Sequence, residues 1–280
     1  MGTIMNLKAA TIIGSDKGGV GKSLLANLLV QAHDVARADV PDAPRINVVE
    51  VDHQRRLSGL LGEERISVSL PATASIAESA ANRWHNESRF NSCYSVWSSG
   101  DSITDLGANT TTSLMDWARH NSVRDFARED GVAFRFVAVA TPDDLAIRSA
   151  QAALRDARDA LGGELFLVLN DTAGGEQGYL PYENGRDLPA LLDDVRGWGA
   201  KVIRIPYCDC MLFAYARARG YTVVDFLRNK DNVLSEIRRE ANLDPTTERF
   251  QLRRFTAWVG VVQNSLQHLF ERPGSESVAA

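Results

Sequence analysis

Residues 8–30 read KAATIIGSDKGGVGKSLLANLLV, and this stretch decides the fold that we expect. Its apolar start predicts a buried strand, Lys8 to Gly14, that ends in a glycine-rich turn. Beyond the turn, leucines recur at helical spacing and predict a helix from about Lys22 to Ala38. The segment between them, Asp16 to Ser23, matches the pattern G-x-x-x-x-G-K-S except at its first glycine, which is Asp16. The stretch therefore predicts a phosphate-binding loop.

The residue types in this loop suit a bound triphosphate. The glycines let backbone N–H groups surround phosphate oxygens, and the amino end of the following helix favours anions. Lys22 is expected to bridge the β- and γ-phosphates, and the Ser23 hydroxyl to ligate Mg²⁺. A turn that binds nothing is the alternative, but strand, loop, Lys-Ser pair and helix occur in the required order. The residues predicted to contact the nucleotide here are Gly18, Gly19, Val20, Gly21, Lys22, Ser23 and Leu24.

The sequence KGGVGKS, with a second lysine at Lys17, resembles the deviant Walker A motif of the ParA/MinD family of P-loop ATPases. The resemblance implies an ATPase that is a homodimer in its ATP state, with slow turnover that a partner stimulates. It also implies that Lys17 crosses the dimer interface and offsets charge on the phosphoryl group bound by the other subunit. Taken without its neighbours, Lys17 would be interpreted as a solvated surface lysine. The likeness extends from about Ala10 to Leu227 and is specific only at the loop.

Two acidic residues at strand ends are the next candidates. The segment VVEVDHQ ends a predicted strand from Ile46 to Val51 and resembles the family's D-x-D-P-Q segment, with Glu50 and His53 as departures. The match implies that Asp52 is the switch I aspartate, which orients the attacking water near Mg²⁺. A strand-end cap is the alternative for Asp52.

The segment SITDLGAN resembles the family's Walker B and switch II segment, although D-L-G-A is a variant of the usual D-T-P-P or D-x-P-A. The resemblance implies that Asp105 holds Mg²⁺ through water and that the Gly107 N–H senses the γ-phosphate. A turn followed by a helix cap is the alternative here. The metal ligands predicted in total are Ser23, Asp52 and Asp105.

Two later segments resemble the parts of the family that flank the base. Asn170 ends a predicted strand and is expected beside adenine. The four residues from Asn170 to Ala173 lack the Asp in fourth place that reads guanine in N-K-x-D, so ATP is favoured over GTP. The segment IPYCD resembles I-P-x-D and implies that Pro206, Tyr207 and Cys208 lie beside the base. Ala214 and residues 219–224 fit the helix and loop that follow.

Strands alternate with helices along most of the chain, which predicts a doubly wound, mostly parallel β-sheet with helices on both faces. Ligands bind beyond the carboxyl ends of such strands, and every motif above falls there. The further elements predicted are strands at 102–106, 132–140, 165–169 and 202–205 and helices at 112–127, 143–161, 188–198 and 248–270. We expect a P-loop ATPase domain over 1–246, a helix over 247–271 packed on it or at a dimer interface, and a disordered tail over 272–280. Residues 54–99 show no strong periodicity of apolar residues.

The composition of the chain limits the classes of protein to which it can belong. The chain has 280 residues and a net charge of −5, which excludes a uniformly basic nucleic-acid-binding protein but not a local basic patch. Three cysteines without framework spacing favour a reducing cytoplasm. No apolar run approaches the roughly 20 residues that span a bilayer. Neither the histidines nor the pair Cys208 and Cys210 has the spacing of a metal site.

Three roles stay open. The first is DNA partition, maintenance or conjugative transfer for a plasmid or other mobile element, through non-specific DNA on the nucleoid or a DNA-bound adaptor protein. Residues 217–254 hold nine Lys and Arg against six Asp and Glu, a small excess that suits phosphate contacts. The second is a MinD-like ATPase positioned on membranes. The third is a nucleotide-binding scaffold with little turnover, which the variant Walker B segment allows.

Overall fold

The computed structural model describes residues 7–37, 44–70, 83–221, 223, 226, 230–241 and 243–270. Seven strands form one sheet in the order β3-β2-β4-β1-β5-β6-β7, and every neighbouring pair is parallel. The strands are β1 Lys8–Gly14, β2 Asn47–Val51, β3 Val68–Leu70, β4 Ser102–Leu106, β5 Val132–Ala140, β6 Glu164–Asn170 and β7 Lys201–Ile205. The predicted α/β class with a doubly wound parallel sheet is confirmed.

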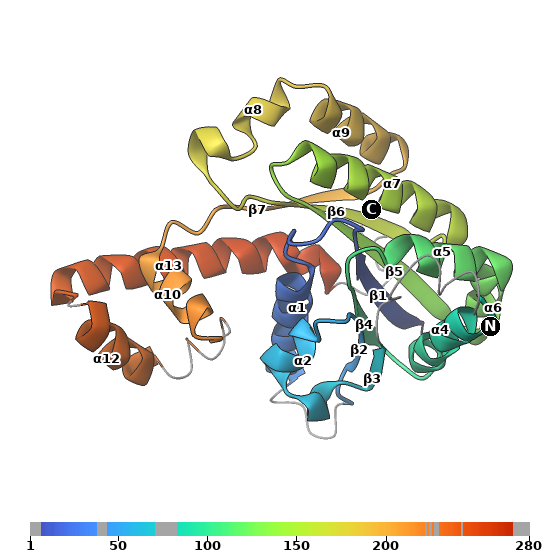
Figure 1. Cartoon of the computed structure of the whole chain (residues 1–280), viewed down its shortest axis with the longest axis horizontal. Coiled ribbons are helices and arrows are strands. Elements are labelled where there is room, and N and C mark those ends of the chain that lie inside the picture. Colours follow the sequence, from blue (N-terminus) through green and yellow to red (C-terminus); the bar gives the residue numbers. More distant parts are fainter. Residues whose placement is uncertain are drawn as a thin grey trace, which may run out of the picture.

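Helices cover both faces of the sheet (Figure 1). Alternate residues of each strand point to opposite faces, so Ile12 belongs to one core cluster and Ile13 to the other. The first cluster packs against α4 Arg83–Trp97, α5 Thr111–His120, α6 Val123–Asp130, α7 Asp144–Ala160 and α9 Asp187–Gly197. The second packs against α1 Lys22–Arg37, α2 Arg56–Leu61 and the end of α13 Pro245–Leu266. Because both faces are buried, the strands read as almost continuous apolar runs.

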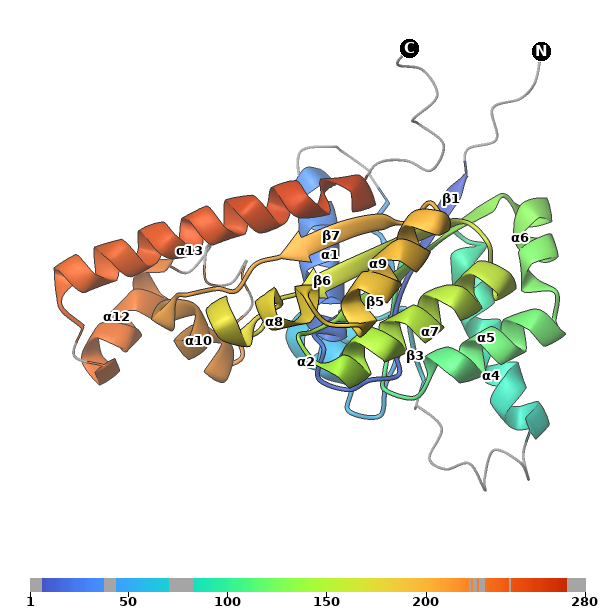
Figure 2. The ribbon, with the colours of Figure 1, turned by 90° about the horizontal axis from the view of Figure 1, so that it is seen from above.

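A third cluster lies beyond the β7 edge of the sheet. There α10 Met211–Ala218, α12 Lys230–Ala241 and the first half of α13 pack together, as both ribbon views show (Figures 1 and 2). Phe255 of α13 is at its centre, with ring centroids 5.6 Å from Phe213 and 4.7 Å from Phe226. The helix α13 thus joins this cluster to the sheet. Among the described helices, none is both long and apolar enough to cross a membrane.

The structure differs from the predicted elements in two places. The single helix predicted over 112–127 is two helices, α5 and α6, because Ser122 takes a left-handed conformation with φ 49° between them. The stretch 54–99, which showed no strong period, contains α2, β3 and α4 among its described residues.

The short elements are α8 Leu180–Glu183 and the 3-10 turns Glu63–Arg65, Gly175–Gln177 and Gln267–Leu269. Ala38, Thr222, Val224 and the expected tail 272–280 lie outside the described residues.

Candidate functional site

The sequence motifs meet around two adjoining cavities at the carboxyl ends of the strands. The larger, about 690 Å³, is lined by loop residues 18–24 together with Asp52 and Gly107. The smaller, about 460 Å³, is lined by Asn170 and by residues 205–208. The residues that line both are Gly21, Leu24 and Phe213. Their combined shape, one polar loop-lined part and one largely apolar part, suits a ligand with an anionic and an aromatic end.

The phosphate loop has the backbone conformation that its glycines allow. Gly19 and Gly21 have φ of 79° and 100°, which disfavours other residues. Lys22 begins α1 with a side chain only 6% exposed, and its ammonium donates to the carbonyls of Ser15 at 2.8 Å and Lys17 at 2.9 Å. Burial lowers the pKa of Lys22, while Asp105 and other nearby carboxylates oppose that shift. The loop is therefore formed around a buried cation.

Asp105 is the buried anion that faces this cation. It is 1% exposed, and neither carboxylate oxygen accepts a well-formed hydrogen bond from the part of the chain that the structure describes. Burial raises its pKa from 3.8 to about 7, and the nearby Ser23 hydroxyl and Lys22 ammonium oppose that rise. A buried carboxylate beside a hydroxyl is a donor set of hard oxygens that fits Mg²⁺. The residues of the described segments hold no cluster of three or more His, Cys, Asp or Glu side chains arranged for a metal.

Asp52 and Gly107 lie together where β2 and β4 end. A Cβ at Gly107 would lie 2.8 Å from Asp52 Oδ1 and 2.9 Å from the Val51 carbonyl, so only glycine fits. The Gly107 N–H, which was predicted to sense a γ-phosphate, donates to the Val51 carbonyl at 2.7 Å and is already paired. Asp52 Oδ1 accepts from the Gln54 N–H at 3.2 Å, so the carboxylate caps the strand end and also lines the larger cavity.

Glu50 is a functional neighbour that sequence analysis recorded only as a departure from a pattern. Its carboxylate is fully buried and accepts from the Leu57 N–H at 2.6 Å and from the N–H and hydroxyl of Ser58. It thereby satisfies the first N–H groups of α2, which borders the larger cavity. The signal was available in the sequence, because an acidic residue in an apolar strand requires a buried partner.

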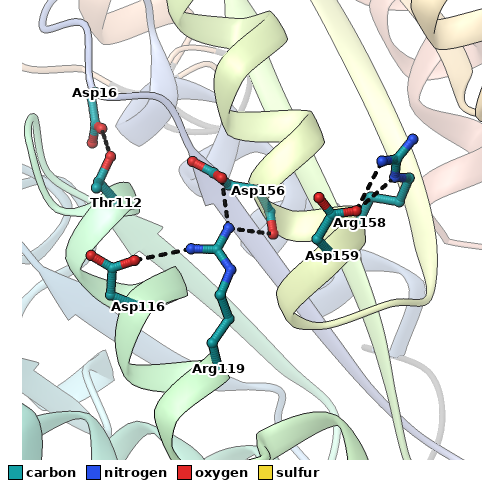
Figure 3. Close-up of polar contacts among 7 residues, drawn as sticks. All are labelled: Asp16, Thr112, Asp116, Arg119, Asp156, Arg158 and Asp159. Atoms are coloured by element: carbon teal, nitrogen blue, oxygen red, sulfur yellow. Dashed lines mark hydrogen bonds and ion pairs between the residues drawn. The ribbon is translucent and has the colours of Figure 1, made fainter.

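Asp16 and Ser149 also hold the loop, and neither was assigned a role. Asp16 accepts hydrogen bonds from the Thr111 N–H at 2.9 Å and the Thr112 hydroxyl at 2.6 Å, the second of which is drawn in Figure 3. Ser149 of α7 accepts from the Lys17 N–H at 3.1 Å and lies 3.2 Å from the Ser15 hydroxyl. The ammonium of Lys17 makes no hydrogen bond or ion pair with the residues described here. No sequence pattern points to these long-range contacts.

The wall of the smaller cavity is attached to both the loop and the C-terminal helix. The Asn170 side-chain amide donates to the Val20 carbonyl at 3.0 Å. The Pro206 carbonyl accepts from the Trp258 indole N–H of α13 at 2.8 Å, and Trp258 itself lines the smaller cavity. Tyr207 is exposed, and Cys208 is a half-buried free thiol. The sequence predicted Trp258 only as part of the helix over 248–270 and gave it no role in the site.

Comparison with known proteins gives structural similarity alone, since no family model and no curated protein matches the chain. An ATP complex of McdA from Cyanothece is 12% identical, with 93% of this chain and 96% of that chain covered and a TM-score of 0.47. MinD from Aquifex aeolicus in a MinC:MinD cell division complex is 16% identical, with 84% and 96% covered and a TM-score of 0.46. The structure of MinD alone, from the same organism, is 16% identical, with 84% of this chain and 98% of that chain covered and a TM-score of 0.43. The chain is thus similar to these proteins in structure, and its function is inferred below from the site.

Proposed function

We propose that this chain is a Mg²⁺-dependent ATPase of the ParA/MinD type that acts as a nucleotide-switched homodimer. The observation that carries the proposal is the buried Lys22 ammonium within a glycine loop, close to the buried carboxylate of Asp105 and the Ser23 hydroxyl. A cation and an anion buried together at a strand end are costly unless a ligand uses them. A triphosphate would accept from Lys22 and the loop N–H groups, and Ser23 with Asp105 would hold Mg²⁺.

The chemistry is in-line attack of water on the γ-phosphorus, with ADP as the leaving group. Lys22 turns from the Ser15 and Lys17 carbonyls to the β- and γ-phosphates and offsets their developing charge. Asp52, at the wall of the larger cavity, positions the water. Bound Mg²⁺ supplies further neutralisation of phosphate charge.

The adenine is placed in the smaller cavity. Val139, Val168 and Ile205 supply apolar lining from three strands, and Asn170 and Pro206 supply polar edges. The Asp171 carboxylate, the nearest candidate for reading a guanine amino group, accepts instead from the Ala173 and Gly174 N–H groups. This use of Asp171 supports ATP over GTP.

Lys17 is proposed to complete the site of a second subunit. It is half-exposed, and its ammonium is unpaired within the described part of the chain. In a face-to-face dimer it would reach the partner's phosphates, as an arginine finger does. Lys17→Ala should then retain ATP binding and lose ATP-dependent dimerisation in analytical ultracentrifugation.

Transfer or partition of mobile-element DNA is the proposed role, with non-specific DNA or a DNA-bound adaptor as partner. Support comes from exposed arginines on α12 and α13 that form no ion pair with described residues, namely Arg239, Arg249 and Arg253. Residues 1–246 would form the ATPase domain, and the helix within 247–271 would carry part of the DNA surface. Cytoplasm or nucleoid is the matching location.

Two alternative roles, a membrane-bound ATPase and a scaffold with little turnover, can be separated from the DNA role by binding and turnover assays. Exposed Phe250 and Val261 on α13 favour a membrane-surface helix as the second candidate. ATP-dependent DNA retention that fades with salt and falls in Arg249→Ala/Arg253→Ala, but not in Arg196→Ala on the distant helix α9, supports the DNA role. Co-sedimentation with anionic liposomes instead supports the membrane role. Absence of phosphate release, with and without DNA and with Lys22→Ala as the blank, would indicate a scaffold.

A further inference from the structure

Asp16 connects the phosphate loop to the segment that follows Asp105. Its carboxylate accepts from the Thr111 N–H and the Thr112 hydroxyl, and its backbone carbonyl accepts from the Asn109 N–H at 3.2 Å. Thr111 and Thr112 form the first turn of α5, where free N–H groups favour an anion. The glycine that usually stands at this position of the loop has no side chain to make such contacts.

Lys22 holds the backbone on both sides of Asp16. It donates to the carbonyls of Ser15 and Lys17, the two residues that flank Asp16 in the sequence. Both bonds use the same ammonium that a triphosphate would engage. Occupation of the loop therefore removes the donor from the carbonyls immediately before and after Asp16.

Further contacts attach the loop and α5 to the neighbouring helix α7. Ser149 of α7 holds Ser15 and Lys17 from the opposite side. The far end of α5 is tied to α7 by Arg119, which donates to Asp156 at 2.6 Å and also to Asp116 at 2.9 Å (Figure 3). The first turn of α5 is thus attached to the loop, and its last turn is attached to α7.

We propose that Asp16 is a positioning residue that transmits occupancy of the phosphate loop to residues 109–112 and the first turn of α5. The inference rests on the proposed function, because it requires a triphosphate at Lys22. When Lys22 turns to the phosphates, the backbone at 15–17 loses both of these hydrogen bonds and shifts, and Asp16 carries the start of α5 with it. The surface that a partner meets at this turn then differs between the empty and the ATP-bound protein.

Amide hydrogen exchange of the whole protein, with and without saturating Mg·ATP, tests the inference. In the wild type, exchange over residues 108–113 should change by at least about fivefold, the low end of coupling between two sites. Asp16→Ala should lose this response, and Asp16→Asn, which keeps an acceptor for Thr111 and a partner for Thr112, should restore it. Ser149→Ala, which loosens the same loop segment without touching α5, should keep it.

The outcomes separate the inference from the proposed function. If calorimetry shows no ATP binding by the wild type, the proposed function fails. If the wild type binds ATP and Asp16→Ala responds like the wild type, the inference fails. If Asp16→Ala does not bind ATP, Thr112→Val decides, because Thr112 lies outside the nucleotide cavities: a reduced response supports coupling, and a full response contradicts it. Loss of the response in Ser149→Ala as well would indicate only general loosening of the loop and would contradict the specific role of Asp16.

Discussion

Asn170, at the end of β6, donates a 3.0 Å hydrogen bond from its side-chain amide to the backbone carbonyl of Val20 in the phosphate loop. The two residues are 150 positions apart in the sequence, and the contact fixes the boundary between the two cavities. Gly21 is packed against the same amide, since a Cβ there would lie 2.6 Å from Asn170 Nδ2. The loop is therefore shaped by Asn170 from the smaller cavity as well as by its own glycines.

Replacement of Asn170 by alanine should weaken ATP binding by about fivefold, because one hydrogen bond of roughly 1 kcal/mol to the loop is lost. Calorimetry with both ATP and inorganic tripolyphosphate distinguishes an effect of Asn170 on the loop from an effect on the base. If Asn170 acts by shaping the loop, both ligands lose affinity; if it reads the base, only ATP does. Exposed Asn184→Ala is the matched control. Unchanged affinity for both ligands would remove Asn170 from the site.

Asp105 should give the empty protein a distinctive dependence of stability on pH. Its pKa is raised from 3.8 to about 7, so in that window the folded chain keeps a proton that the unfolded chain has lost. The free energy of unfolding should therefore fall as the pH rises through the window, by at most about 1.4 kcal/mol per unit for this group.

The difference between wild type and Asp105→Asn isolates this group, because the amide does not titrate. Without nucleotide, the variant should gain stability relative to the wild type as the pH rises from about 5 to 8, reaching at least about 1 kcal/mol. Urea unfolding at several pH values measures it. Mg·ATP should stabilise only the wild type. A pH-independent difference would show that Asp105 is ionised throughout.

Glu50 should act on the site through its charge and through its hydrogen bonds separately. Its carboxylate helps to raise the pKa of Asp105, so Glu50→Gln should shift the pH midpoint of Mg²⁺-dependent ATP binding to lower values. Glu50→Ala also removes the acceptor for Leu57 and Ser58, and it should lower the free energy of unfolding by about 1.5–3 kcal/mol. Equal effects of the two substitutions would contradict this division.

Trp258 should link the C-terminal helix to nucleotide affinity. Trp258→Phe keeps an aromatic ring beside Phe213, whose centroid lies 5.0 Å away, but removes the donor to the Pro206 carbonyl. We expect a loss of about 1 kcal/mol in stability and a several-fold weaker affinity for ATP, with affinity for tripolyphosphate unchanged. Equal weakening for both ligands would show that Trp258 does not act through the smaller cavity and would contradict this prediction.

The strands could be predicted from the sequence because a parallel sheet buried on both faces leaves a continuous apolar run. β4 and β5 were predicted with their observed bounds. β3 has three residues, too few for a pattern. In α4, Phe90, Cys93 and Trp97 lie at helical spacing and are buried, but polar neighbours mask the stripe in the sequence.

The position of Lys22 at the end of a glycine loop could be predicted from a local pattern, whereas the long-range contacts around it could not. The bonds from Asp16 to Thr112 and from Trp258 to Pro206 join residues that only the fold brings together. The break at Ser122 is similar, because a left-handed conformation there is not signalled by a turn residue such as glycine.

Titration calorimetry of the folded protein with Mg·ATP, for the wild type and Lys22→Ala side by side, tests the central claim most directly. We predict saturable binding by the wild type that weakens on chelation of Mg²⁺ and falls at least about 100-fold, roughly 2.7 kcal/mol, in the variant. Absence of heat with both ATP and GTP in the folded wild type, or equal binding by the two proteins, would contradict it.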